Sequence, residues 1–335
     1  MLRYLLRRLL LLGPVLLGIS LITFVLMRLI PGDPVAIMLQ GEASSPEDLQ
    51  RMRAAWGLDQ PAPVQYLSYI AHLLTGDFGR SFMRQQPVLP LILDVLPATI
   101  ELALASLVIA TLFAIPLGCI SALKHRSGID RAVTLLTVLG ISMPGFWIGL
   151  LLVLLFSVTL NWLPASGRLE FSVGLEPVTG FYVLDSVLQG NFDALGDALA
   201  HLVMPAFVLG TAMAALTARM TRSSMLEVMH QEYVTSARAK GLRERAVIVS
   251  HMLRNALLPV VTIIGIQAGT ILGGAVVVET IFAWPGLGRL TVQAISARDY
   301  FLLQGIVLCF ALTRVFFNVL VDVLYSLLDP RIRFS

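Results

Sequence analysis

The sequence is poor in charge and lacks the motifs that mark common soluble enzymes. Only 13% of its 335 residues are charged and 57% are hydrophobic, whereas a soluble domain carries about 25% charge. Neither lysine, Lys124 or Lys240, follows a glycine, so the Gly-Lys-Ser/Thr phosphate loop is missing. No histidine precedes a glutamate, and no Gly-x-Ser-x-Gly sequence occurs. We therefore expect a membrane protein that is not an enzyme and that holds no metal ion and no cofactor.

Cysteine is scarce, and the net charge is small. Cys119 and Cys309 both lie inside apolar runs, which favours a packing role and implies no disulfide framework. The formal net charge of +3 gives no indication of a nucleic-acid partner.

Long apolar runs dominate what is present. About 20 apolar residues are needed to cross roughly 30 Å of hydrocarbon as a helix, and six segments qualify: 9–27, 102–123, 132–162, 198–218, 254–279 and 301–328. The first run is followed by Pro31-Gly32-Asp33-Pro34 and not by a signal-peptidase site, so we expect a retained span. The sequence predicts an all-α membrane protein with six transmembrane helices in a lipid bilayer.

The basic residues indicate the orientation of these spans. Fifteen lysines and arginines fall in the segments that would be cytoplasmic if both termini are inside, and seven fall on the other side. Four of those seven lie in one long loop, where the positive-inside rule has little force. Both termini are therefore predicted to be cytoplasmic.

Two outer loops are long enough to have structure of their own. In the loop 31–97, Ser45 and Pro46 have the pattern of a helix start and Gly57 that of its end. A second short helix is expected from Pro63 to Leu74. The loop 163–197 is acidic, with Arg168 as its single basic residue. Each loop could be a cover over helix ends or a contact site for a partner.

A polar, basic segment from Thr221 to Leu258 separates two apolar runs. Tyr233, Ala237 and Gly241 recur at a spacing of four, which would place small residues on one helical face beneath an aromatic ring. Gly241 should cap or turn that helix, and a second helix is expected from Glu244 to Asn255. The segment could fit a groove in another protein, or it could rest on anionic lipid.

This segment resembles the coupling motif of permease subunits of bacterial ABC importers. That motif reads Glu-Ala-Ala, three residues, Gly, nine residues, Ile-x-Leu-Pro, and here Thr235-Ser236-Ala237, Gly241 and His251-x-Leu253 fit it in the form used by the peptide-importer branch. Further matches lie along the chain: Pro31-Gly32-Asp33-Pro34, Gly76-Asp77-Phe78-Gly79-Arg80-Ser81, Ser142-Met143-Pro144, Glu279 to Gly288, Arg298-Asp299-Tyr300 and Asp329-Pro330-x-Ile332-Arg333. The similarity is greatest to the first permease subunit of dipeptide importers.

The resemblance implies the type I ABC importer fold and a bacterial inner-membrane location. Residues 1–97 would hold the first helix and an outer loop, 98–328 the transmembrane core with a coupling loop at 222–256, and 329–335 a cytoplasmic tail. The partners would be a second permease subunit, two ATP-binding cassette subunits that bind ATP and Mg²⁺, and a periplasmic peptide-binding protein. The residues expected to contact the ATPase are Tyr233, Thr235, Ser236, Ala237, Arg238, Lys240, Gly241, His251 and Leu253.

The cargo implied is a dipeptide or short peptide, although related subunits carry oligopeptides, glutathione, haem or nickel. The rival class, a self-contained secondary transporter, would need ion-binding or proton-relay groups within the bilayer. Glu101 and a stripe on the sixth span are almost the only candidates.

That stripe is formed by Arg314, Asn318 and Asp322, which follow one another at intervals of four. It could line the pathway or its gate, or it could hold helices together. The ridge Gly265, Gly269 and Gly273 should pack closely against a helix, which could belong to the second permease.

The turn after the fifth span has two alternative roles. Its four residues could help to receive the peptide-binding protein, or its aromatic rings could anchor the chain at the membrane surface. These residues are Phe282, Trp284, Pro285 and Gly286.

Overall fold

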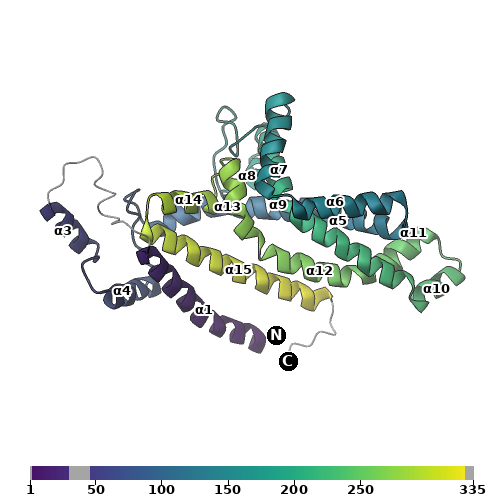
Figure 1. Ribbon diagram of the computed structural model, residues 1–335, viewed down its shortest axis with the longest axis horizontal. Coiled ribbons are helices and arrows are strands. Elements are labelled where there is room, and N and C mark those ends of the chain that lie inside the picture. The colour runs from purple at the N-terminus through teal and green to yellow at the C-terminus, as the bar shows by residue number, and fades with distance from the viewer. Residues whose placement is uncertain (1, 30–45, 329–335) are drawn as a thin grey trace. The chain divides into compact units, whose positions relative to one another are not determined.

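A computed structural model describes residues 2–29 and 46–328 (Figure 1). This part of the chain is helical, and its only β pairing is an isolated bridge between Arg80 and Pro87. The predicted helix cap Ser45 and the tail at 329–335 lie outside the described residues. The chain forms two compact units. Unit 1 takes the described residues up to Pro97 together with Gly286–Val315, and unit 2 takes Ala98–Pro285 and the described residues from Phe316 onward.

Unit 1 contains both helices predicted for the first outer loop. Its elements are α1 (Leu2–Leu29), α3 (Pro46–Ala55), α4 (Ala62–Leu74), the start of α5 (Val88–Leu123), α14 (Leu287–Ser296) and the first half of α15 (Tyr300–Leu328). Gly57 ends α3 as predicted, with a φ of 64° and a bond from the Leu58 amide to the Arg53 carbonyl. The side chains of Phe82, Ile92 and Ile306 are buried in the core of this unit.

Unit 2 is organised around the long helix α9 (Phe192–Met229), which packs against α6, α7, α8 and α12. Glycines allow α5 to approach α9 closely: a Cβ at Gly118 would lie 2.6 Å from the Ala218 carbonyl oxygen, and one at Gly210 would lie 2.8 Å from that of Ser106. The other elements are α6 (Gly128–Ser142), α7 (Gly145–Leu152), the π-helix η1 (Val153–Thr159), α8 (Tyr182–Leu188), α10 (Glu232–Ala239), α11 (Glu244–Ala246), the π-helix η2 (Val247–Leu253), α12 (Arg254–Ala268) and α13 (Ile271–Ile281).

Four described helices are long and apolar enough to cross a membrane: Val88–Leu123, Phe192–Met229, Glu244–Ala268 and Tyr300–Val319. They cover the second, fourth, fifth and sixth predicted spans. If the bent helix pair in the third predicted span is counted as one span, the described residues contain five. The second helix begins at Val88, well before the predicted position 102. The apolar part of α1, Gly13–Leu29, is shorter than any of these four helices.

Two predicted spans are broken, and the first break has a local cause. The third bends by 105° between Ser142 and Gly145, because Pro144 has no amide hydrogen and holds Met143 in an extended conformation with ψ of 130°. The fifth is interrupted between Ala268 and Ile271. There a Cβ on Gly269 would lie 2.8 Å from the Asn318 side-chain oxygen. At Gly269 the glycine ridge therefore packs against α15 of the same chain.

Candidate functional site

The predicted coupling helix is α10, and it rests on a small apolar core of unit 2. Val234 and Ala237 point into this core and are buried with Met225 of α9 and Met252 of η2. Because Ala237 is only 6% exposed, it is not part of an open face of small residues, in contrast to the prediction. The two apolar positions, three residues apart, fix which side of α10 faces outward.

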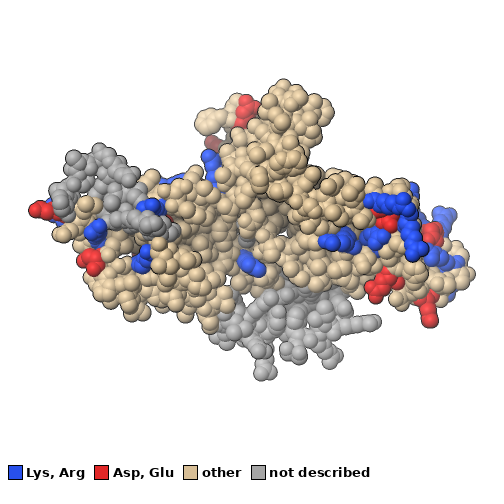
Figure 2. Space-filling model, viewed as in Figure 1, with Lys and Arg blue, Asp and Glu red and all other residues tan. Residues whose placement is uncertain are grey.

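The outward side of α10 carries most of the residues predicted to contact the ATPase. Tyr233, Thr235, Ser236, Arg238, Lys240 and Gly241 are exposed, whereas His251 and Leu253 are half-buried in η2. Figure 2 shows lysines and arginines gathered over the end of unit 2 that carries α10 and α11, with acidic residues among them. We call the segment from Glu232 to Glu244, which carries these exposed residues, the docking segment.

The docking segment turns sharply at Gly241. Its φ of 73° lies in the left-handed region, and its amide donates to the Arg238 carbonyl at 2.9 Å. Arg238 and Glu244 pair across this turn, with Nη2 and Oε1 2.6 Å apart. The hydrogen bond from Arg238 lowers the pKa of Glu244. The turn is therefore held by both a backbone bond and an ion pair, and it presents the Gly241 backbone without a side chain.

A buried carboxylate joins the ends of α6 and α9 beside this segment. Asp130, 5% exposed, accepts bonds from the Ser121 hydroxyl at 2.6 Å and the Arg126 amide at 2.9 Å. The Arg222 guanidinium donates to both of its oxygens, at 2.7 and 2.9 Å. The bonds from Arg222 and then Ser121 hold the pKa of Asp130 well below its usual range. Sequence reasoning missed this pair because its members are 92 positions apart.

Replacing Asp130 with asparagine should remove about 2 kcal/mol of stability at neutral pH, since a charged acceptor of several hydrogen bonds is lost. The folded-state pKa lies below the value of about 4 in an unfolded chain. The contribution is therefore complete above about pH 4 and disappears as the pH falls through that value towards the folded-state pKa. Thermal unfolding of the purified protein between pH 3 and 8 measures the difference. The control is Glu227→Gln at an exposed position of α9. If the difference in unfolding temperature between the native protein and Asp130→Asn does not narrow in acid, the lowered pKa assigned to Asp130 is wrong.

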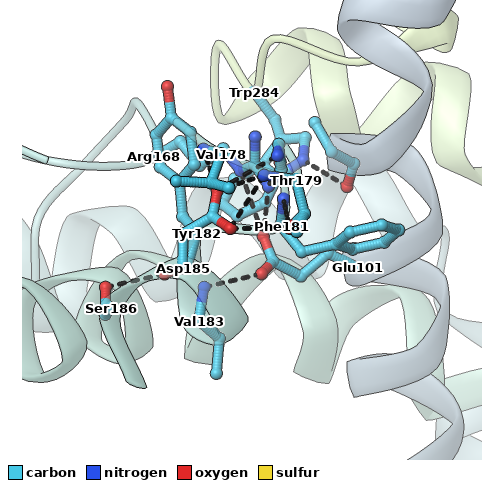
Figure 3. Close-up of polar contacts among 12 residues, drawn as sticks. Glu101, Arg168, Val178, Thr179, Phe181, Tyr182, Val183, Asp185, Ser186 and Trp284 are labelled. Atoms are coloured by element: carbon cyan, nitrogen blue, oxygen red, sulfur yellow. Dashed lines mark hydrogen bonds and ion pairs between the residues drawn. The ribbon is translucent and has the colours of Figure 1, made fainter. Parts of the chain in front are cut away.

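The loop 163–190 is held by a buried ion pair (Figure 3). Arg168 and Glu101 are 6% and 8% exposed, and the guanidinium Nη2 and Nε lie 2.5 and 3.1 Å from the same carboxylate oxygen. The other oxygen of Glu101 accepts from the Val183 amide at 2.8 Å. The guanidinium stacks 3.8 Å above the Tyr182 ring and donates to the Gly180 carbonyl at 2.6 Å. Glu101 is thus occupied by the chain's own arginine, which leaves it no role as an ion-coupling group in this arrangement.

A second carboxylate, Asp185, orders the same loop. It is fully buried and accepts from the amides of Val178, Thr179 and Gly180 at 2.9–3.2 Å and from the Thr179 hydroxyl at 2.6 Å. Burial alone would raise the pKa of Asp185, but these hydrogen bonds together bring it below its ordinary value. The acidic loop is therefore a built element of the fold and not a loose connection.

The aromatic residues predicted to form an outer docking surface lie inside unit 2. Phe282 and Trp284 are 2% and 1% exposed. The Trp284 indole donates to the Ala98 carbonyl at 2.9 Å, and the Phe282 carbonyl accepts from the Gly167 amide at 2.9 Å. These rings offer neither a docking face nor a membrane anchor, because their surface is used in the core. Of the four predicted residues Pro285 is exposed and Gly286 is buried.

The polar stripe of the sixth span is only partly seen. Arg314 is exposed and belongs to unit 1, whereas Asn318 is half-buried and meets Gly269 within unit 2. The side chain of Asp322 lies outside the described residues. The contact of Asn318 favours a role in holding helices together at that position.

Comparison with known proteins gives one consistent result over the whole chain. Residues 114–334 match the profile of the binding-protein-dependent transport system inner membrane component, and residues 1–103 match that of its N-terminal region. A di/tripeptide transport system permease protein of Pseudomonas aeruginosa is 46% identical over 333 residues, 99% of each chain. A dipeptide transport system permease protein of Escherichia coli K12 is 46% identical over 336 residues, again 99% of each. A putative peptide transport system permease protein of Brucella abortus is 44% identical over 322 residues, 96% of each.

Proposed function

Because the chain belongs to the family of inner membrane components of binding-protein-dependent transport systems, we propose that it is one half of a pore that imports dipeptides and other short peptides. The observation that carries this proposal is the full-length similarity, at 46% identity, to permeases whose names specify dipeptides or di- and tripeptides. A second permease subunit would supply the other half of the pore. A periplasmic peptide-binding protein would deliver the cargo.

ATP and Mg²⁺ would be bound by two cytoplasmic cassette subunits. The exposed side of α10 supports this part of the proposal, because it presents polar and basic side chains and the Gly241 turn on a firmly packed base. In this scheme the docking segment fits a groove of the ATPase and transmits the closing and opening of the ATPase pair to the helices. The pore would then alternate between outward and inward access.

We propose six transmembrane helices with both termini in the cytoplasm, and cysteine labelling tests this topology. In a variant whose two native cysteines are replaced by serine, Ser172→Cys in the outer loop should react with an impermeant thiol reagent added to the periplasm. Arg243→Cys in the docking segment should react only after the membrane is permeabilised. Both positions are exposed, so accessibility differs only by side of the membrane. Labelling with the opposite sidedness would refute the orientation.

Uptake by the reconstituted complex tests the function itself. Proteoliposomes with both permeases, the ATPases and the loaded binding protein should accumulate labelled alanyl-phenylalanine only when ATP is supplied on the ATPase side. Competition by unlabelled oligopeptide, glutathione, haem or nickel reveals whether one of these is the preferred cargo. Uptake by this chain alone, driven by an ion gradient without ATP, would show a secondary transporter and overturn the proposal.

A further inference from the structure

Unit 1 contains a cavity of about 620 Å³ between α1, α4, the turn at 76–82 and the start of α15. Phe24, Trp56 and Phe82 contribute aromatic walls, and Ser68, His72 and Gln304 contribute polar ones. In Figure 1 these helices are found by their labels. The volume lies within the range of roughly 300–1,000 Å³ typical of small-molecule sites, and such sites combine apolar walls with a few polar groups.

Two polar side chains in the cavity wall are almost fully buried. Tyr69 is 7% exposed, and its hydroxyl is the one buried side-chain polar atom of the described residues without a partner. Gln304 is 3% exposed and also lines the cavity. Buried polar groups are almost always paired, since an unpaired one costs free energy. The unpaired Tyr69 hydroxyl, together with the Gln304 amide in the same cavity wall, points to a polar occupant.

The same wall offers charges of both signs. Arg28, at the end of α1, stacks 3.4 Å from the centre of the Phe24 ring and donates to the Phe24 carbonyl and the Gln65 side chain. Its stacking and hydrogen bonds hold the guanidinium in the cavity wall. Asp77 also lines the cavity, with one carboxylate oxygen bonded to the Gly79 amide. A ligand that carries one negative and one positive group matches this pair.

We propose that this cavity is a cargo site on the permease itself and that it binds a short zwitterionic peptide. This inference rests on the proposed function. Arg28 would take the peptide carboxylate and Asp77 its ammonium group. Gln304 and Tyr69 would hydrogen-bond the peptide unit, and Trp56 and Phe82 would cover an apolar side chain. A glutamine amide both donates and accepts, which complements the N–H and C=O of a peptide unit. A phosphate group only accepts and would leave the Gln304 carbonyl unpaired, so a lipid headgroup fits less well.

The test is equilibrium binding of radiolabelled alanyl-phenylalanine to the full permease–ATPase complex in nanodiscs, without binding protein or ATP. Gln304→Leu and Tyr69→Phe should each weaken binding about tenfold through the loss of a hydrogen bond from a buried side chain. Tyr66→Phe is the matched control, because the Tyr66 hydroxyl bonds Ser20 and the Leu17 carbonyl and Tyr66 does not line the cavity. This control should leave affinity unchanged.

Stability separates ligand binding from a structural role. Without peptide, Tyr69→Phe should melt at the same temperature as the native complex or higher, since it removes an unpaired buried hydroxyl. At the same peptide concentration, the native complex should gain the larger peptide-dependent shift. Unchanged affinity in both cavity variants overturns the proposal. The proposal is also overturned if a phospholipid co-purifies with the native complex, is lost from Gln304→Leu and is not displaced by peptide. A complex that imports dipeptides yet shows no cavity binding refutes this site alone, whereas peptide binding without ATP-dependent import contradicts the proposed function.

Discussion

Replacing Gly241 with aspartate is expected to abolish retention of the ATPase subunits while the permease still inserts into the membrane. Gly241 is exposed, has a positive φ, and has no atom within 4 Å of the position that a Cβ would take. Aspartate tolerates the left-handed region better than most residues, so the fold should survive. The added side chain and negative charge would face the groove that is proposed to receive this turn.

Co-purification of the ATPases with the tagged permease measures the effect, and at least a tenfold loss is expected. Gly241→Asn is the matched control, since asparagine has nearly the same shape and backbone tolerance without the charge. A smaller loss in this variant would assign part of the effect to charge and the remainder to the bulk of the side chain. Full retention of transport-stimulated ATPases by Gly241→Asp would rule out docking through this turn.

Removing one partner of the Glu101–Arg168 pair is expected to cost about 3–5 kcal/mol, because a buried charge is left uncompensated. Arg168→Met should lower the unfolding temperature of the purified protein and expose residues 163–190 to proteolysis, since the bond to the Gly180 carbonyl and the stacking on Tyr182 are lost with it.

The double variant Glu101→Leu with Arg168→Met should recover a large part of that loss, because apolar replacements remove both buried charges together. Recovery should be incomplete, since the Val183 amide loses its acceptor. The control is the exposed pair of Glu47 and Arg51 in α3, where Glu47→Gln should change stability little. A double variant as unstable as the single one would show that the pair itself is not the source of the effect.

Features encoded in a few neighbouring residues could be predicted from the sequence. The ends of α3 and α10 at Gly57 and Gly241 follow from the residue type that a left-handed turn requires, and both glycines have a positive φ. The start of α5 at Val88 was not predicted, because Pro90, Asp94 and Pro97 in its first turns are residue types typical of loops. The bend after Ser142 was missed because hydropathy measures apolar length and not the direction of the chain.

Features that depend on residues far apart in the sequence could not be predicted. Arg168 was correctly seen as the one basic residue of an acidic loop, yet its partner Glu101 lies 67 positions away. Trp284 was interpreted as a surface residue because it stands next to a turn, yet its indole donates to the carbonyl of Ala98, 186 positions away. The missing partner of Tyr69 becomes visible only when α1, α4 and α15 are seen together.

The core beneath α10 has a mechanical consequence. Val234 and Ala237 pack with Ala122 at the end of α5, Met225 in α9 and Met252 just before α12. Protein interiors are close-packed and resist compression, so a pull on α10 cannot be absorbed by deforming this contact. The ends of three long helices must then move together with α10 as one rigid body. Force applied at one eight-residue helix is thereby shared among helices that are each long enough to cross the bilayer.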